Sequence, residues 1–186
     1  MIDEEKNPWT ILNEKKIYTN PWIELTEFDV LNPSGGKGIY GVVHFHHAAI
    51  GILPLDENNN TWLVGQYRFP LKQYSWEIPE GGGKKNIPLL ESAKRELLEE
   101  TGIEANEWIP IIETHLSNSA TDEFGIIYIA RNLSFQNSSP EETEDLRVKK
   151  LPFNELYKMV MNGEITDGLT MLAVMKAKLM MIEGKM

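Results

Sequence analysis

Residues 95–103 read RELLEETGI, and this stretch decides how the fold around it is interpreted. Small and aliphatic side chains recur at helical spacing before and within it: Leu90, Ala93 and Leu97. With Pro88 near the start and Gly102 just beyond the end, this period predicts an amphipathic helix over about 88–100. At about 100° per residue, three acidic side chains fall on one face of that helix: Glu96, Glu99 and Glu100.

These three carboxylates would repel one another. At about 6 Å and an effective dielectric near 20, each pair costs roughly 3 kcal/mol, which an enclosed site has to compensate. Glu91, Arg95 and Glu99 are spaced by one helical turn and can form an ionic ladder, which leaves Glu96 and Glu100 to bind a cation. Their hard oxygens suit Mg²⁺, which binds through one or two carboxylates plus substrate phosphates. The alternative is a solvated acidic face that binds nothing.

Residues 76–83, WEIPEGGG, lead from a predicted strand toward this helix. Three successive glycines let backbone amides and carbonyls approach a ligand closely, because glycine has no Cβ. We therefore predict a loop here that brings backbone groups to the acidic face. A plain flexible turn would use the same glycines.

The segment from Gly81 to Ile103 resembles the Nudix box. That pattern is Gly, five residues, Glu, seven residues, then Arg-Glu-aliphatic-any-Glu-Glu-any-Gly-aliphatic, and Ile87 stands where it has its first Glu. In the family this outer Glu organises the loop more than it binds metal. The resemblance implies a Nudix hydrolase that holds Mg²⁺, with Mn²⁺ as the alternative. The ligands would be the backbone carbonyl of Glu80 and the carboxylates of Glu96, Glu99 and Glu100.

Residues 65–70, GQYRFP, and the β-rich N-terminal segment add to this resemblance. Together with residues 76–82 they are similar to the ADP-ribose and nucleotide-sugar pyrophosphatase branch, so the likeness covers most of the chain. It implies a homodimer in which the N-terminal strands contribute to the partner's site. It also implies a set of substrate-binding residues: Arg68, Glu77, Gly81 and Gly82. An ordinary surface arginine on a strand edge is the alternative for Arg68.

A second polar loop, SNSATDE at residues 117–123, follows the box. Such loops position catalytic groups on a rigid scaffold. In the branch named above, a Glu of this loop helps to activate the attacking water, so Glu123 is expected to be catalytic together with Glu99 and Glu100. Asp122 is the alternative within the loop, and a plain turn would also use these residue types.

The order of predicted elements favours an α+β fold. Strands are expected at 22–30, 40–45, 51–55, 61–65, 108–112, 125–130 and 146–150, the last after an acidic connection. Helices are expected from about 154 and from about 168, the latter capped by Asp167. We expect an α/β/α layered Nudix fold with a mixed sheet between helices. Residues 1–45 would form an antiparallel β extension for dimerisation and substrate contact, and residues 46–186 the hydrolase domain.

Composition narrows the class of partner. The 186 residues carry 18 basic and 28 acidic side chains, so 18 − 28 gives a net charge of −10, which disfavours nucleic acid and anionic membranes. The chain has no cysteine, which excludes disulfides and Cys-ligated metals, and it opens without an apolar signal segment, so a cytoplasmic protein is expected. Zinc at His44, His46 and His47 is disfavoured because no Cys or carboxylate accompanies them in sequence.

The expected activity is metal-dependent hydrolysis of the pyrophosphate bond in a nucleoside diphosphate linked to a sugar. ADP-ribose, cleaved to AMP and ribose 5-phosphate, is the first candidate, and GDP- or UDP-sugars are the alternative. Glu123, or else Glu99, would accept the proton of the attacking water. A nucleotide-binding regulator without turnover is the rival, and Ile87 is the one feature that favours it.

Overall fold

The computed structural model describes residues 6–136 and 146–186, so most of the predicted acidic connection, 137–145, lies outside it. The chain divides into two compact units. One contains Met1–His47 and Ser117–Glu123, and the other contains Ala48–Leu116 and Phe124–Met186. Within the described ranges, no helix has the length and apolar character needed to cross a membrane.

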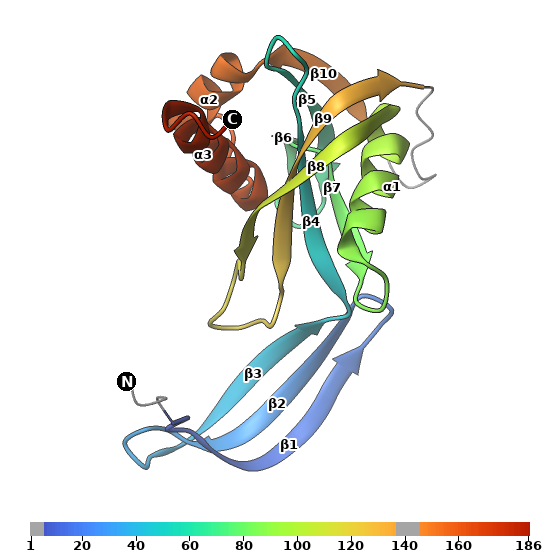
Figure 1. The fold of residues 1–186 in the computed structure, drawn as a ribbon. Coiled ribbons are helices and arrows are strands. Elements are labelled where there is room, and N and C mark those ends of the chain that lie inside the picture. The colour runs from blue at the N-terminus through green and yellow to red at the C-terminus, as the bar shows by residue number, and fades with distance from the viewer. Residues whose placement is uncertain (1–5, 137–145) are drawn as a thin grey trace. The chain divides into compact units, whose positions relative to one another are not determined.

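The first unit is built on a curved antiparallel sheet of three strands, in the order β1-β2-β3 (Figure 1). The strands are β1 (Thr10–Thr19), β2 (Ile23–Leu31) and β3 (Lys37–Phe45). Asn32 closes the turn between β2 and β3, because its side chain accepts hydrogen bonds from the N–H groups of Ser34 and Gly36, both at 3.0 Å. Strand β1 was not expected from the sequence, and all ten of its residues are exposed.

The second unit contains a four-stranded sheet in the order β7-β4-β9-β8. Its strands are β4 (His47–Pro54), β7 (Glu80–Lys84), β8 (Ile103–Thr114) and β9 (Gly125–Phe135). β4 pairs with β9 in parallel, whereas β8 pairs with β9 antiparallel, so the predicted mixed sheet is confirmed. The glycines at 81–83 belong to β7, so the prediction of a loop there was wrong.

A second sheet of this unit has the order β10-β5-β6. It is antiparallel and contains β5 (Asn60–Arg68), β6 (Gln73–Glu77) and β10 (Arg147–Pro152). The predicted turn between β4 and β5 is present, and within it Asn59 adopts a positive φ of 55°. The two strands that it joins nevertheless lie in different sheets.

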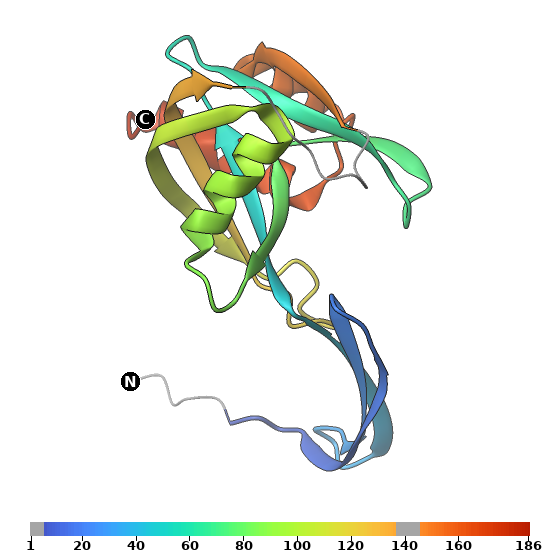
Figure 2. The same cartoon turned by 90° about the vertical axis from the view of Figure 1, so that its right-hand side faces the viewer.

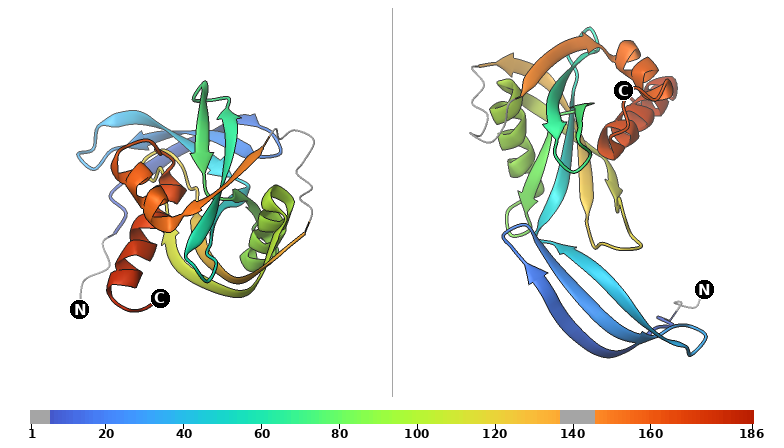
Figure 3. Two further views of the ribbon diagram at one scale, coloured as in Figure 1. Left: turned by 90° about the horizontal axis from the view of Figure 1, so that it is seen from above. Right: turned by 180° about the vertical axis from the view of Figure 1, so that it is seen from behind.

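Helices cover both faces of the four-stranded sheet (Figures 1 to 3). α1 (Leu89–Thr101) lies on one face, while α2 (Phe153–Met161) and α3 (Gly168–Ile182) lie on the other, as the left panel of Figure 3 shows. Alternate residues of β4 divide between the two cores: Ile50 and Ile52 pack with α1, and Leu53 packs with α2 and α3. This arrangement agrees with the predicted layers and confirms the α+β class.

Candidate active site

Helix α1 presents the acidic residues of the box from a rigid support. Ala93 and Leu97 are fully buried, which fixes the rotation of the helix and therefore the direction of its acidic face. Gly102 ends the helix in the left-handed conformation, with a φ of 70°, and its N–H donates to the carbonyl of Leu98 at 2.8 Å. The local sequence thus sets both the orientation and the end of α1.

Strand β7 lies directly against this acidic face. A Cβ placed on Gly81 would overlap the carboxylate of Glu96, so with any other residue here the Glu96 side chain would have to turn away from the strand. One residue earlier, the backbone N–H of Glu80 donates to Oε2 of Glu100 at 3.0 Å. Four of the predicted site residues are therefore brought together by one strand–helix contact: Glu80, Gly81, Glu96 and Glu100.

Arg95 balances part of the negative charge. Its guanidinium contacts Oε1 of Glu96 and Oε2 of Glu99, both at 2.5 Å. The expected Arg95–Glu99 pair is therefore confirmed. Glu91 pairs instead with Lys94 at 2.8 Å, so the extension of the ladder to Glu91 was wrong. The expectation that Arg95 would leave Glu96 unengaged was also wrong, because the guanidinium is wide enough to reach both carboxylates.

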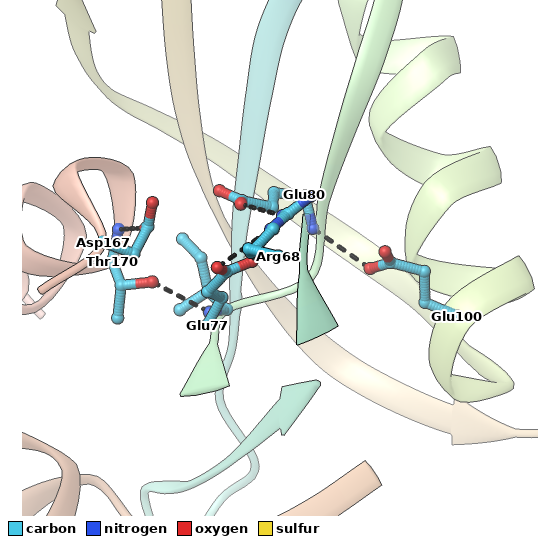
Figure 4. Close-up of polar contacts among 7 residues, drawn as sticks. Arg68, Glu77, Glu80, Glu100, Asp167 and Thr170 are labelled. Carbon is cyan, nitrogen blue, oxygen red and sulfur yellow. Dashed lines mark hydrogen bonds and ion pairs between the residues drawn. The ribbon is translucent and has the colours of Figure 1, made fainter. Parts of the chain in front are cut away.

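A second charged cluster lies beside the box (Figure 4). Nε of Arg68 donates to both carboxylate oxygens of Glu77 at 3.0 Å, and its Nη2 contacts Glu77 and, at 2.6 Å, Oε1 of Glu80. Arg68 and Glu77 were expected to bind substrate, and in the structure they bind each other. This fork-shaped contact is the geometry that a guanidinium offers to a carboxylate.

Asp167 joins this cluster, which the sequence analysis did not anticipate. Ligand oxygens of Glu77, Glu80 and Asp167 lie within 4.8 Å of one another. Asp167 also caps α3 as predicted, accepting from the N–H of Thr170 at 2.7 Å, and the Thr170 hydroxyl accepts from the N–H of Ile78 at 3.0 Å. The start of α3 thereby holds the segment that carries Glu77 and Glu80. No local signal links residues ninety positions apart.

The two glutamates of this cluster differ in their charge state. Burial opposes ionisation of Glu77, but the hydrogen bonds and charge of Arg68 outweigh it, and the pKa of Glu77 is lowered. Burial, followed by the charges of Asp167 and Glu77, raises the pKa of Glu80 well above its usual range. Glu77 is therefore held ionised, while Glu80 favours its protonated form.

The loop with Glu123 belongs to the first unit. The structure therefore does not itself group Glu123 with the glutamates of α1. Burial raises the pKa of Glu123, and its N–H donates to the Thr121 hydroxyl at 3.4 Å. Within the same unit, Nδ1 of His44 lies 2.8 Å from Oδ2 of Asp122.

The residues around β7 fit a hard divalent cation. Their donors are carboxylate and backbone oxygens, and the Glu96 carboxylate occupies the position that a Cβ on Gly81 would take. The Arg95 side chain is 45% exposed, so it can turn to solvent when another cation takes over the charge of Glu96 and Glu99. The side chain of Glu80 is engaged by Arg68.

Comparison with known families agrees with this geometry. The NUDIX domain model matches residues 45–168, and the model of the nucleoside diphosphate sugar hydrolase N-terminal domain matches residues 9–43. The chain belongs to the Nudix family, and its fold and acidic helix are those of a Nudix hydrolase. Nudix hydrolases generally use a divalent metal ion.

Three proteins illustrate the similarity. The chain is 31% identical to an ADP-ribose pyrophosphatase of Bacillus subtilis, over 92% of this chain and 91% of that protein. It is 29% identical to an ADP-ribose pyrophosphatase of Mycobacterium tuberculosis, over 88% and 80% of the two chains. A crystal structure of an ADP compounds hydrolase, 18% identical, superposes with a TM-score of 0.85 over 99% of this chain and 100% of that chain, which supports the fold.

Proposed function

We propose that this protein hydrolyses the pyrophosphate bond of a nucleoside diphosphate joined to a sugar, with ADP-ribose as the first substrate and AMP and ribose 5-phosphate as products. The observation that carries the proposal is the contact between β7 and α1. Gly81 lies against Glu96 and the N–H of Glu80 binds Glu100, so the strand and the helix of the box meet at these residues. The names of the two pyrophosphatase relatives support the choice of substrate.

In the proposed site, Glu96, Glu99, Glu100 and the carbonyl of Glu80 hold Mg²⁺, with Mn²⁺ as the alternative. The bound ion supplies the positive charge that a diphosphate needs in order to enter an acidic site and react there. Gly81 and Gly82 are proposed to contact the substrate along β7 through their backbone groups. Arg68 contributes a donor at the edge of the site, because about a third of its side chain stays exposed while Glu77 orients it.

Glu123 is the proposed general base. A base works best when its pKa lies near the working pH, and burial moves the pKa of Glu123 upward, in that direction. Glu99 is the alternative, since it lies on the acidic face of α1 and its side chain is 30% exposed. In either role, the carboxylate takes the proton from the water as the water attacks phosphorus.

The activity is tested by incubating the protein with ADP-ribose and Mg²⁺ and measuring the release of AMP. Replacing Glu100→Gln keeps the size of the side chain but removes its charge, so AMP release should fall at least about 100-fold. The matched control is Glu91→Gln on the same helix, which pairs only with Lys94 among the ion pairs of the described chain and should keep wild-type activity. ADP-ribose binding without product would support a nucleotide-binding regulator instead.

GDP- and UDP-sugars form the second candidate class. The match of residues 9–43 to a nucleoside diphosphate sugar hydrolase domain favours this broader group. A panel of ADP-ribose, GDP-mannose and UDP-glucose, compared by kcat/KM, decides between them. A cytoplasmic site of action, where such nucleotides are abundant, is part of the proposal.

The proposed assembly is a homodimer formed through the first unit. Every residue of β1 is exposed, and large apolar side chains are among them: Ile11, Leu12, Ile17 and Tyr18. A hollow on the same sheet is lined by Asn7, Trp9, Ile11, Phe28, Val30, Tyr40 and Val42. An exposed apolar sheet face of this kind is typical of an interface.

A further inference from the structure

The short segment between β6 and β7 is held by hydrogen bonds from two other elements. The N–H of Ile78 donates to the hydroxyl of Thr170 on α3 at 3.0 Å (Figure 4). The carbonyl of Pro79 accepts from the N–H of Ile52 on β4 at 2.8 Å. Ile78, Thr170 and Ile52 are fully buried, so losing either bond would leave a backbone group without a partner in the core.

The same segment leads directly into the candidate metal site. The N–H of Glu80 donates to Oε2 of Glu100 at 3.0 Å, so the backbone at Glu80 orients one of the proposed ligands. The carbonyl of Glu80 is itself a proposed ligand, and its place follows from the same backbone. Losing a group that orients a metal ligand typically costs about 10- to 100-fold in metal affinity. The position of the Glu80 backbone therefore bears on two ligands at once.

A proline makes this segment stiff. The ring of Pro79 locks its own φ, and it also restricts the backbone of the residue before it, Ile78. Few soft torsions therefore separate the N–H of Ile78 from that of Glu80. Because the segment cannot absorb a displacement easily, a shift at Ile78 is carried to Glu80.

Thr170 is well placed to hold the start of this segment. Asp167 caps α3 by accepting from the N–H of Thr170 at 2.7 Å, so the first turn of the helix is fixed. Ala173 and Ala177, further along α3, are fully buried in the core of this unit. A β-branched side chain also has few rotamers in a helix. The hydroxyl of Thr170 therefore offers the Ile78 N–H an acceptor at a fixed position.

We propose that Thr170 is a positioning residue for the metal site. Through the N–H of Ile78 it sets where the backbone of Glu80 lies. That backbone in turn places its own carbonyl and the carboxylate of Glu100. The inference rests on the proposed function, in which these two groups bind the metal ion. It gives α3, which carries none of the proposed ligands, a part in metal binding.

Binding of Mn²⁺ alone tests this inference without turnover, because the EPR signal of the free ion reports how much is bound. Thr170→Val keeps the shape of the side chain but removes the hydroxyl, and it should weaken Mn²⁺ binding about 10-fold. Thr170→Ser keeps the hydroxyl and should bind Mn²⁺ within about twofold of the wild type. If Thr170→Val binds Mn²⁺ as tightly as the wild type, or Thr170→Ser as weakly as Thr170→Val, the proposal is wrong.

Thr61→Val is the matched control. Thr61 of β5 is also fully buried, but its hydroxyl has no hydrogen-bond partner within the described ranges of the chain. Its replacement should change neither the melting temperature nor the Mn²⁺ affinity. Thr170→Val should lower the melting temperature by about 3–8 °C, because the N–H of Ile78 loses its acceptor.

Equal losses of Mn²⁺ affinity in Thr61→Val and Thr170→Val would overturn the proposal, since any change to a buried threonine would then disturb the site. If Thr170→Val does not fold, Thr170→Ala takes its place under the same criterion. This variant removes the hydroxyl without placing a second methyl group against the N–H of Ile78.

The metal dependence of AMP release from ADP-ribose gives a second readout. In Thr170→Val the Mg²⁺ concentration for half-maximal rate should rise about 10-fold, while the rate at saturating Mg²⁺ stays within about threefold of the wild type. If the wild type binds Mn²⁺ but releases no AMP, the proposed function fails and the Mn²⁺ affinities still test Thr170. If the wild type releases AMP and Thr170→Val keeps its metal dependence, only the role of Thr170 fails. A wild type that binds no Mn²⁺ would overturn both.

Discussion

Gly81 is the residue on which the candidate active site depends most directly. It allows β7 to lie against the Glu96 carboxylate, in the space that any other side chain would occupy. Gly83, two positions along the same strand, has a different role, because a Cβ there would meet Ile50 and Leu89 in the core. One strand thus uses two glycines for two purposes, one at the site and one for packing.

Gly81→Ala should remove metal-dependent activity with less effect on the fold. Glu96 would have to turn away from β7, so the rise in melting temperature on adding Mg²⁺ should be largely lost and kcat/KM should fall about 100-fold. Gly83→Ala should instead lower the stability by about 1–3 kcal/mol through overpacking. Gly38→Ala, where a Cβ meets nothing within 4 Å, is the control. If Mg²⁺ raised the melting temperature of Gly81→Ala as much as that of the wild type, the proposed role of Gly81 would be wrong.

Arg68 is the counter-ion of a nearly enclosed carboxylate, since Glu77 is only 3% exposed. Arg68→Met leaves that charge unbalanced and should destabilise the protein by about 3 kcal/mol in urea unfolding at pH 7. The lowered pKa of Glu77 means that its pairing stabilises the wild type above pH 4.5 and that this stability is lost as pH falls below that value. The difference in unfolding free energy between Arg68→Met and wild type should therefore become smaller as the pH falls below 4.5.

Arg95→Met is the comparison for this prediction. Arg95 also binds two carboxylates, but it is 45% exposed, and Glu99 can reach water without moving the backbone. Its replacement should cost less than about 1 kcal/mol. If Arg68→Met and Arg95→Met lose the same unfolding free energy, burial of the carboxylates does not decide how much each arginine stabilises the protein.

At the scale of single elements, the turn between β4 and β5 is fixed by one carboxylate. Oδ1 of Asp56 accepts from the N–H groups of Asn58 at 2.9 Å and Asn60 at 2.7 Å, and Lys150 of β10 contacts Oδ2 at 2.9 Å. The turn is therefore linked both to the strand that follows it and to the neighbouring strand of the second sheet.

Asp56 should make a pH-dependent contribution to stability. Burial favours the neutral form, but hydrogen bonds from Asn60, Lys150 and Asn58 outweigh it and lower the pKa of Asp56 from 3.8 to about 2. The stabilisation is complete above pH 3.8 and is lost as pH falls toward 2; it should amount to about 2 kcal/mol. Asp56→Asn should be less stable than wild type at pH 6, with the difference closing between pH 4 and 2.

The control for this series is Glu57→Gln, an exposed neighbour in the same turn. It should follow the wild-type pH dependence of unfolding within about 0.5 kcal/mol. If the difference in unfolding free energy between Asp56→Asn and wild type stays constant down to pH 2, the pKa of Asp56 is not lowered by folding.

At the scale of the whole molecule, β1 is a strand that its own chain leaves exposed along its entire length. A three-stranded sheet with little core of its own is marginal in water unless something covers it. We therefore expect sedimentation to give the mass of two chains. Ile11→Lys should shift the mass toward one chain, because it places a charge among the apolar residues of β1, whereas Lys15→Gln on the same strand should not. A monomeric wild type would contradict the proposed assembly.

The sequence predicted the helix over 88–100, the cap at Asp167, the central strands and the mixed sheet, because these follow from local period and turn chemistry. It missed β1, whose apolar residues come in adjacent pairs and do not alternate with polar ones, and it predicted β7 as a loop because glycine disfavours strands on average. In β7 the close approach of α1 outweighs that preference.

The spacing of Glu96, Glu99 and Glu100 was enough to place their carboxylates on one face of a helix, and the resemblance to the Nudix box predicted a metal-dependent hydrolase. Which groups meet those carboxylates depended on the fold. Arg68 and Asp167 come together with Glu77 and Glu80, and Asp122 meets His44, only because segments distant in the chain lie side by side. Local periodicity fixes which face of a helix is acidic, but contacts across the chain are fixed by packing, which no local pattern encodes.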